Sequence, residues 1–429
     1  MWEELMNHRI FILGSSEEFI QLVKLSKSRG ICTIVCDGNP DGPAKKEADI
    51  VYDVDVRSTE KIAEICRKER VDGILTAFSD LLLECMVKIA AKAGLPCYLM
   101  PEQLKFYRDK SVMKKMFASL DIPTPRYVET GADCSPDLLG DLRFPVVTKP
   151  LDRYGSRGVL VLNSLEEIRS RFHEICAGSE AEKILLEEYN TGYEFNLMAW
   201  VNNGQVFVLG IADREKSPGE AHSIPVCSRN VYPSCLMDHV YQDAKRILEK
   251  VIRFTGQQDG ELSMQFFWHP DRGIEVCEIA ARFLGYEHEL IEFCSGLSIE
   301  ELLLNSVYAP ERIPLMLQEH NPFFDKSSAV LYFHGREREI ASLESAEKCF
   351  RSPEISQSWI FYRPGEHVQE FARPYVARCF LHAGTREEID RATDRIFAEM
   401  SIPDSSGEEI LYRNVRTQYP DALTGRHQK

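Results

Sequence analysis

The sequence predicts a protein of mixed α/β and α+β class, with an N-terminal doubly wound parallel sheet, a two-part middle domain and a C-terminal α+β unit. Three observations support this prediction. The 429 residues are too many for one compact core and suggest about three domains. Strand-like apolar runs alternate with helical patterns as far as Leu99, and this alternation stops after Pro101.

The N-terminal part, residues 1–104, is predicted to be a scaffold domain. Its strand patterns occupy residues 10–13, 33–36, 50–54 and 73–76, and its helical patterns occupy residues 18–28, 59–69 and 81–93. Such alternation is typical of an open parallel sheet. Gly14 and Asp37 could belong to a dinucleotide site, but that fingerprint needs three spaced glycines and only Gly14 is present.

The middle domain is predicted to span residues 105–310, with a lid subdomain at about residues 115–190. It begins with a helix near residues 109–120 and ends with a helix at 299–308, after which several prolines mark a connection. The C-terminal α+β subdomain, residues 311–429, has strand patterns at 329–333, 359–362 and 375–382 and a helical pattern at 386–400.

Composition excludes several classes of partner. The formal net charge of −16, from 51 basic and 67 acidic side chains, would repel a phosphate backbone, so no nucleic-acid partner is expected. No apolar run approaches the roughly 20 residues that a membrane span needs, so no membrane partner is expected. The 13 cysteines show no paired CxxC spacing, which favours a reduced, cytoplasmic protein.

Two lysines precede features that suit phosphate binding. An apolar strand delivers Lys149, and the small-residue loop after it contains Gly155 and Ser156, whose backbone N–H groups could close over phosphate oxygens. Lys110 opens a helix, which is a favourable place for an anion. Taken singly, the loop could equally be a surface hairpin, and Lys110 could be a solvated first-turn residue.

A second strand leads into a turn rich in acids. Glu187, Tyr189 and Glu194 surround the turn at Gly192. A carboxylate can accept a hydrogen bond from an adenine amino group or from ribose hydroxyls, and main-chain groups can bind the edge of the base. The alternative is a pair of solvated turn acids.

A predicted hairpin carries candidate metal ligands. The strand patterns at 260–267 and 273–285 would bring Gln265 beside Glu278, and oxygen ligands on adjacent strands suit Mg²⁺. A charged Glu278 in an apolar strand is costly unless it is paired or coordinated. Arg282 lies just beyond and could stabilise the charge on a transferring phosphoryl group.

Residues 213–236 are predicted to form a long irregular segment, and such segments are often binding loops. We expect His222 and Arg229 in this segment to contact an acid substrate. Surface charge is the competing interpretation.

In their order and separations, these elements resemble the ATP-grasp superfamily over about residues 10–310. The resemblance implies a pre-ATP-grasp N-terminal domain, ATP with Mg²⁺ or Mn²⁺ as cofactors, and the following roles. Lys110 and Lys149 would bind phosphates under a lid containing Gly155 and Ser156; Glu187 and Tyr189 would lie at adenine and Glu194 at ribose; Gln265 and Glu278 would hold the metal; and Arg282 would be catalytic. Gln265 and Ala280 stand where many members have metal-binding residues.

The resemblance is strongest to the carboxylate-amine and amino-acid ligase branch, and Gln265 resembles the carbamoyl-phosphate synthetase large chain. It implies a ligase that activates a small-molecule carboxylate as an acyl phosphate and joins it to an amine, with amino-acid-like substrates expected. Three alternatives stay open: a nucleotide-binding sensor with reduced turnover, a bicarbonate-type carboxylating enzyme and, more remotely, a dehydrogenase. A homodimer is the expected assembly if the chain self-associates, because dimers are the commonest assembly of soluble homo-oligomers.

Overall fold

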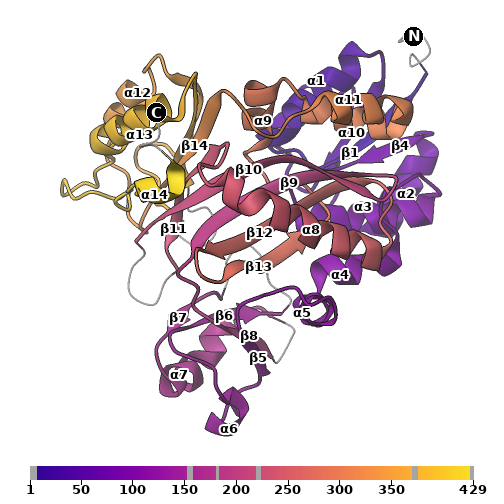
Figure 1. Ribbon diagram of the computed structural model, residues 1–429. Coiled ribbons are helices and arrows are strands. Elements are labelled where there is room, and N and C mark those ends of the chain that lie inside the picture. The colour runs from indigo at the N-terminus through magenta and orange to yellow at the C-terminus, as the bar shows by residue number, and fades with distance from the viewer. Residues whose placement is uncertain (1–6, 152–157, 180–182, 219–223, 370–374, 426–429) are drawn as a thin grey trace.

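The computed structural model of the chain describes residues 7–151, 158–179, 183–218, 224–369 and 375–425, and its strands form three sheets (Figure 1). The strands are β1 (Arg9–Leu13), β2 (Cys32–Asp37), β3 (Ile50–Asp53), β4 (Gly73–Leu75), β5 (Tyr127–Thr130), β6 (Val146–Pro150), β7 (Val161–Leu162), β8 (Ile184–Glu188), β9 (Tyr193–Asn202), β10 (Gln205–Ser217), β11 (Val226–Tyr232), β12 (Gly260–His269), β13 (Gly273–Ala280), β14 (Ser327–His334), β15 (Ile355–Ile360) and β16 (Tyr375–Ala383). The α-helices are α1 (Ile20–Ser28), α2 (Thr59–Lys68), α3 (Asp80–Ala93), α4 (Leu104–Arg108), α5 (Lys110–Ser119), α6 (Pro136–Leu139), α7 (Leu165–Ile175), α8 (Met237–Thr255), α9 (His288–Ser295), α10 (Ile299–Tyr308), α11 (Ile313–Glu319), α12 (Glu344–Cys349), α13 (Arg386–Glu399) and α14 (Asp421–Thr424).

The N-terminal sheet is parallel, with strand order β3-β2-β1-β4. Strand β1, which lies between β2 and β4, is largely apolar and buried on both faces, as parallel strands between helices usually are. Helix α3 begins where the Ser79 hydroxyl accepts a hydrogen bond from the N–H of Leu82, and it ends at Gly94 with a positive φ of 71°. This cap places Asp80 in the first turn, at the edge of the sheet that faces the rest of the molecule.

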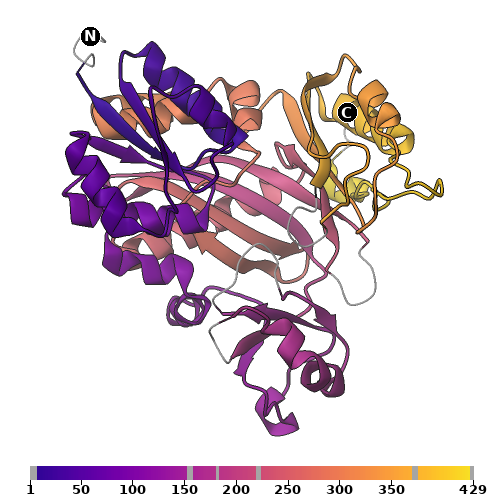
Figure 2. The ribbon, with the colours of Figure 1, turned by 180° about the vertical axis from the view of Figure 1, so that it is seen from behind.

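A small antiparallel sheet of order β5-β8-β6-β7 lies at the lower end of the molecule in Figures 1 and 2. It has its own apolar core, in which Val146 and Ile184 pack against Ile168 and Phe172 of α7. Lys149 on β6 is the register partner of Leu185 on β8, two residues before Glu187. The small sheet therefore carries a cation and an acid near each other.

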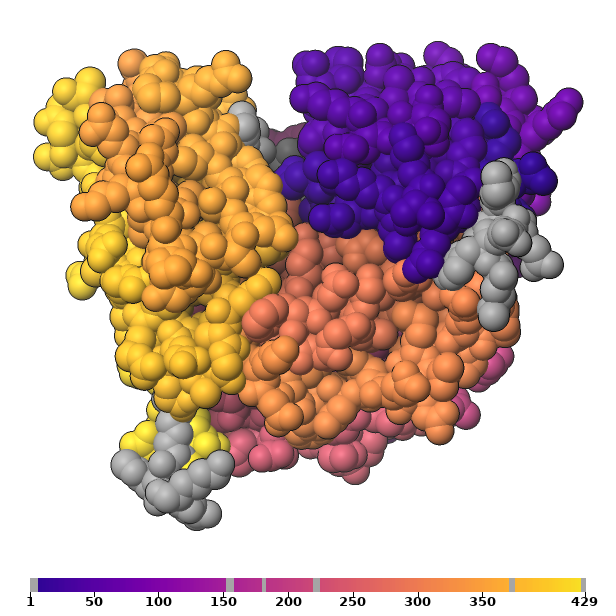
Figure 3. All heavy atoms as spheres, turned by 90° about the horizontal axis from the view of Figure 1, so that it is seen from above, coloured from indigo at the N-terminus to yellow at the C-terminus, as the bar shows by residue number. Residues whose placement is uncertain are grey.

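The third sheet has eight strands in the order β13-β12-β9-β10-β11-β14-β16-β15, all antiparallel. Gln265 on β12 pairs directly with Glu278 on β13, as the predicted hairpin requires. The amphipathic helix α8 packs its apolar side chains into the core that this sheet shares with the N-terminal part. Figure 3 shows the N-terminal domain and the C-terminal unit on opposite sides of one face of the molecule.

The structure confirms the predicted fold class, with two differences. Within the segment predicted to be irregular, 213–236, residues 213–217 belong to β10 and residues 226–232 belong to β11, and these two strands pair with each other. Arg214 and Arg229, which suggested a loop there, form ion pairs with Glu194 and Glu215. In addition, the strands of the C-terminal unit extend the eight-stranded sheet through pairing of β11 with β14. Within the described residues, no helix is long and apolar enough to cross a membrane.

Candidate active site

A cavity of about 840 Å³ lies where the small sheet, the eight-stranded sheet and the N-terminal domain meet. Such a volume is typical of small-molecule and cofactor sites. Eight of the residues that the sequence singled out line this cavity: Lys110, Lys149, Glu187, Tyr189, Glu194, Gln265, Glu278 and Arg282. They come from α5, from the small sheet, from β9, β12 and β13 and from the segments that follow β8 and β13.

Glu187 is held between two lysines on the cavity wall. Lys149 Nζ donates to one carboxylate oxygen, and Lys114 Nζ lies 2.7 Å from the other. Burial alone would raise the pKa of Glu187, but the charges of Lys149 and Lys114 lower it to about 2. Burial would likewise lower the pKa of Lys149, yet Cys277 and Glu187 raise it above its usual value. Lys149 therefore keeps its positive charge at neutral pH.

Lys114 does not line the cavity but holds Glu187 there, and sequence reasoning missed this role. It is 2% exposed and lies one helical turn after Lys110 on α5. The signal was the spacing of four residues between the two lysines, which places both on one face of the helix.

Glu194 is surrounded by partners on neighbouring strands. Arg214 Nε lies 3.0 Å from one carboxylate oxygen, and Lys216 and Gln265 contact the same carboxylate. Burial would raise the pKa of Glu194, but Lys216 and Arg214 lower it below its usual value. Arg214 and Lys216 also line the cavity, so β10 contributes two cations that sequence reasoning did not include among the predicted phosphate-binding residues.

Arg282 is fixed by an acid of the N-terminal domain. Its Nη2 and Nε atoms lie 2.9 and 3.1 Å from the two carboxylate oxygens of Asp80, which is a bidentate pair. Burial would raise the pKa of Asp80, but Arg282 lowers it. Nothing in the local sequence singled out Asp80, because its role depends on a contact 202 residues away.

Lys110 also lines the cavity. Its Nζ donates to the carbonyl oxygen of Pro150 at 3.3 Å. Burial lowers the pKa of Lys110, and the nearby Glu278 partly offsets this effect. The cavity thus gathers cations from helix α5, from the small sheet and from the large sheet.

Gln265 and Glu278 supply oxygen ligands of the kind that fit Mg²⁺. They are direct cross-strand partners and supply an amide oxygen and a carboxylate. Gln265 donates through its amide nitrogen to Glu194, which leaves the amide oxygen as an acceptor. The described residues contain no group of three or more His, Cys, Asp and Glu side chains placed to hold a metal. Mg²⁺ commonly takes one or two protein oxygens and completes its shell with phosphates and water.

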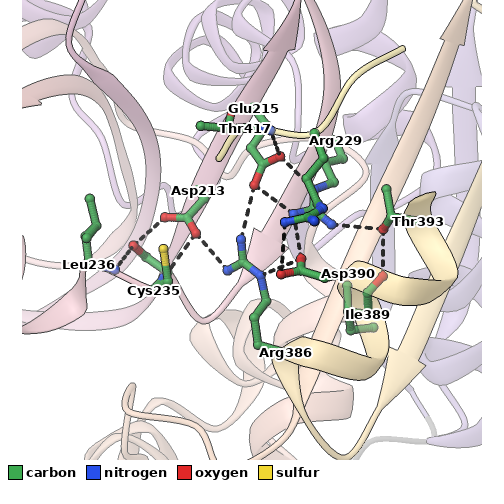
Figure 4. Close-up of polar contacts among 12 residues, drawn as sticks. Asp213, Glu215, Arg229, Cys235, Leu236, Arg386, Ile389, Asp390, Thr393 and Thr417 are labelled. Carbon is green, nitrogen blue, oxygen red and sulfur yellow. Dashed lines mark hydrogen bonds and ion pairs between the residues drawn. The ribbon is translucent and has the colours of Figure 1, made fainter. Parts of the chain in front are cut away.

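Of the remaining predicted residues, the structure describes only Arg229, and Arg229 does not line the cavity. Gly155, Ser156 and His222 lie outside the described residues. Arg229 is fully buried, and its guanidinium contacts Glu215 and Asp390 (Figure 4). The prediction that Arg229 contacts an acid substrate is therefore corrected: its charge is already balanced inside the fold.

Comparison with known proteins agrees with this geometry. Residues 142–288 match the model of the ATP-grasp domain, and residues 10–95 match that of the PylC-like, N-terminal domain. The chain is 30% identical over 299 residues to a 3-methyl-D-ornithine–L-lysine ligase of Methanosarcina barkeri, covering 69% of this chain and 73% of that one. It is 25% identical to a phosphoribosylamine–glycine ligase of Lactococcus lactis, over 66% of this chain and 71% of the relative.

Other relatives are longer or more distant. A carbamoyl phosphate synthase large chain of Clostridium acetobutylicum is 26% identical over 68% of this chain, which spans only 30% of that protein. Among solved structures, an L-amino acid ligase of Bacillus licheniformis superposes with a TM-score of 0.77 at 17% identity, over 93% of this chain and 99% of that one. This likeness shows a shared fold.

The fold and these relatives define the class: the chain belongs to the ATP-grasp ligases, and it is an ATP-dependent enzyme that forms carbon–nitrogen bonds. The predicted family and the predicted enzyme class are confirmed. The roles of individual site residues stay predictions, as do the domain boundaries.

Proposed function

We propose that the 840 Å³ cavity binds ATP with Mg²⁺ and that the enzyme joins an amino-acid-like carboxylate to an amine through an acyl phosphate. One observation carries this proposal. Lys110, Lys149, Glu278 and Arg282 are scattered over more than 170 residues of sequence, yet they line one cavity with the charges that a triphosphate and its metal need.

The residues of the cavity supply alignment and charge. In this proposal, Lys110 and Lys149 bind phosphate oxygens, Glu187 and Tyr189 lie at the base, and Glu194 lies at the ribose. Gln265 and Glu278 would hold Mg²⁺, which would neutralise phosphate charge. Arg282, oriented by Asp80, is then placed to stabilise the charge on the transferring phosphoryl group.

No side chain is needed as a covalent nucleophile. The substrate carboxylate attacks the γ-phosphorus, and the bond between that phosphorus and the bridging oxygen breaks, which releases ADP. The amine then attacks the carbonyl carbon of the acyl phosphate, loses a proton and expels inorganic phosphate. Correct positioning of these reactants can account for much of the rate.

Amino-acid-like substrates are favoured by the relatives. The Methanosarcina barkeri enzyme is named as a ligase of two amino acids, and the Bacillus licheniformis structure is that of an L-amino acid ligase. A cytoplasmic location and a homodimer stay predictions.

The direct test is release of ADP with Mg²⁺ and ATP, measured against single amino acids, pairs of amino acids, and bicarbonate with each amine. We expect release that requires one particular carboxylate and rises with a second amine, together with a new amide product by mass spectrometry. Release that depends on bicarbonate and yields a carboxylated product would contradict the amino-acid assignment and favour a carboxylating enzyme.

A further inference from the structure

Strand β10 has two chemically different faces near its end. Arg214 and Lys216 point into the nucleotide cavity and contact Glu194 there. Asp213 and Glu215, which alternate with them, are almost completely buried on the opposite face. Whatever fixes Asp213 and Glu215 therefore also fixes the direction of the two cavity cations.

The buried face of β10 is held by arginines from two other elements (Figure 4). Arg386, the first residue of α13, lies 2.7 Å from Asp213 and 3.1 Å from Glu215. Arg229 on β11 makes a bidentate pair with Glu215, with both N–O distances 2.8 Å. Asp390 on α13 joins the two arginines, at 2.7 Å from Arg229 and 3.1 Å from Arg386.

These contacts form a charge cluster. Three buried acids, Asp213, Glu215 and Asp390, face three arginines, because Arg416 also lies 3.3 Å from Asp390. Arg416 pairs in addition with Asp394, at 3.0 Å. Further hydrogen bonds come from the N–H of Thr417 to Glu215 and from Arg229 to the Thr393 hydroxyl. Removing one member of such a cluster leaves an uncompensated buried charge, which is strongly unfavourable.

The pairing of β10 with β11 contains a β-bulge next to Glu215. Glu215 pairs with Arg229, but the next residue, Lys216, pairs with Cys227, so Ser228 is the extra residue. The extra residue stands on β11, so β11 is the strand that bends, and β10 keeps its alternation of faces. On β10, Glu215 is held by the charge cluster, and the next residue, Lys216, lines the cavity.

We propose that Arg386 and Asp390 of α13, together with Arg229, are positioning residues for the nucleotide site: through Asp213 and Glu215 they set β10 so that Arg214 and Lys216 hold Glu194 at the cavity wall. This inference rests on the proposed function, since it takes the cavity as the ATP site. It assigns a role in positioning the active site to helix α13, none of whose residues lines the cavity.

The test measures binding of Mg·ADP by titration calorimetry, with the full-length protein and Arg386→Met. We expect the Kd for Mg·ADP to rise at least fivefold. Arg395→Met is the matched control, because Arg395 lies on the same helix and forms an exposed ion pair with Glu354. Its Kd is expected to stay within twofold of the wild type. Arg386→Lys, which keeps one charged contact, should recover part of the affinity.

A structural effect is separated from positioning by a double-mutant cycle with Lys216→Met. If Arg386 acts through β10, the combined loss of affinity is smaller than the product of the two single losses. If the losses multiply, or if Arg386→Met binds as tightly as the wild type, the inference is wrong. Should Arg386→Met not fold, Asp390→Asn takes its place in the same cycle with the same expected outcomes.

The proposed function fails in a distinguishable way. If the wild type binds no Mg·ADP, or if Lys149→Ala binds it as well as the wild type does, the cavity assignment is wrong and this inference falls with it. Loss of binding in Lys149→Ala with normal binding in Arg386→Met overturns the positioning inference alone.

Discussion

At the scale of single residues, the site is built from charges that neutralise one another before any ligand is considered. Glu187 has Lys149 and Lys114, Glu194 has Arg214 and Lys216, and Arg282 has Asp80. Burial of each pair is tolerated because each charge has a partner at hydrogen-bond distance. A nucleotide would therefore enter a cavity whose cations are already charged and oriented.

The first prediction concerns Lys149 and Glu278. We expect Lys149→Ala and Glu278→Ala each to lower the rate of ATP turnover by about 100-fold or more, because each removes a charge that would act on the transferring phosphoryl group or its metal. Turnover is measured as ADP release with the substrates that the panel identifies.

The control for this prediction is a lysine that does not line the cavity. Lys115→Ala changes an exposed lysine of α5 and is expected to leave turnover unchanged. Circular dichroism and the thermal midpoint of each variant show whether the fold is intact. Turnover at the wild-type rate in either site variant would mean that the assignment of the cavity is wrong.

A site residue could be predicted from the sequence only when its immediate neighbours made its side chain unusual. Lys149 and Glu278 each stand in an apolar strand, where a charge needs an explanation, and both line the cavity. Arg229 also stands in a strand, but its partners Glu215 and Asp390 lie 14 and 161 residues away. Sequence spacing could not tell a buried structural arginine from one that contacts a substrate.

At the scale of elements, helices with periodic apolar patterns were predicted well, whereas a strand that ends in charged residues was not. The helix at 299–308 has the predicted ends in the structure, and the helix predicted at 386–400 ends one residue earlier. By contrast, β10 ends in Asp213-Arg214-Glu215-Lys216-Ser217, a polar run that is typical of a loop. It forms a strand because tertiary ion pairs balance its charges, and tertiary context often overrides local propensity.

The element-scale prediction concerns the start of α13, next to Arg386. Thr385 accepts a hydrogen bond from the N–H of Glu388, and Glu388 accepts one from the N–H of Thr385, which together form a capping box. Thr385→Ala should lower the free energy of unfolding by about 1 kcal/mol, measured by urea titration. Thr385→Ser keeps the hydroxyl and should be close to the wild type. Equal loss in both variants would show that packing of the methyl group matters and the cap does not.

At the scale of the whole molecule, the junction between the N-terminal domain and the large sheet contains ionisable groups with shifted pKa values. Burial raises the pKa of Glu261 to about 8, although the Phe283 N–H and the Tyr98 hydroxyl partly offset it. Burial also raises the pKa values of Glu18 and Glu287 to about 7. For His288, burial would lower the pKa, but Glu289 and Glu300 raise it to about 9.

These four shifts act in the same direction on stability. A carboxyl group whose pKa is raised on folding binds its proton more tightly in the folded state, so the folded state loses stability as pH rises from about 4.5 toward that raised value. A histidine with a raised pKa contributes stability that is complete below about 6.5 and is lost as pH rises through about 9. These four groups therefore contribute a decline in the free energy of unfolding between about pH 5 and 9. Burial lowers the pKa values of His334 and His382 to about 4, and these two groups contribute in the opposite direction as pH rises toward about 6.5.

Glu261 allows this expectation to be tested with one atom changed. Glu261→Gln keeps an oxygen that can accept the hydrogen bond from the Phe283 N–H at 2.8 Å, but it cannot ionise. The free energy of unfolding of this variant, measured by urea titration at several pH values, should decline less steeply than that of the wild type between about pH 5 and 8, with a difference of at most about 1.4 kcal/mol per pH unit. Glu102→Gln, at an exposed position, should leave the slope unchanged. The same slope in Glu261→Gln and in the wild type would mean that Glu261 is already ionised in the folded protein, and that the junction holds a buried negative charge in place of a neutral acid.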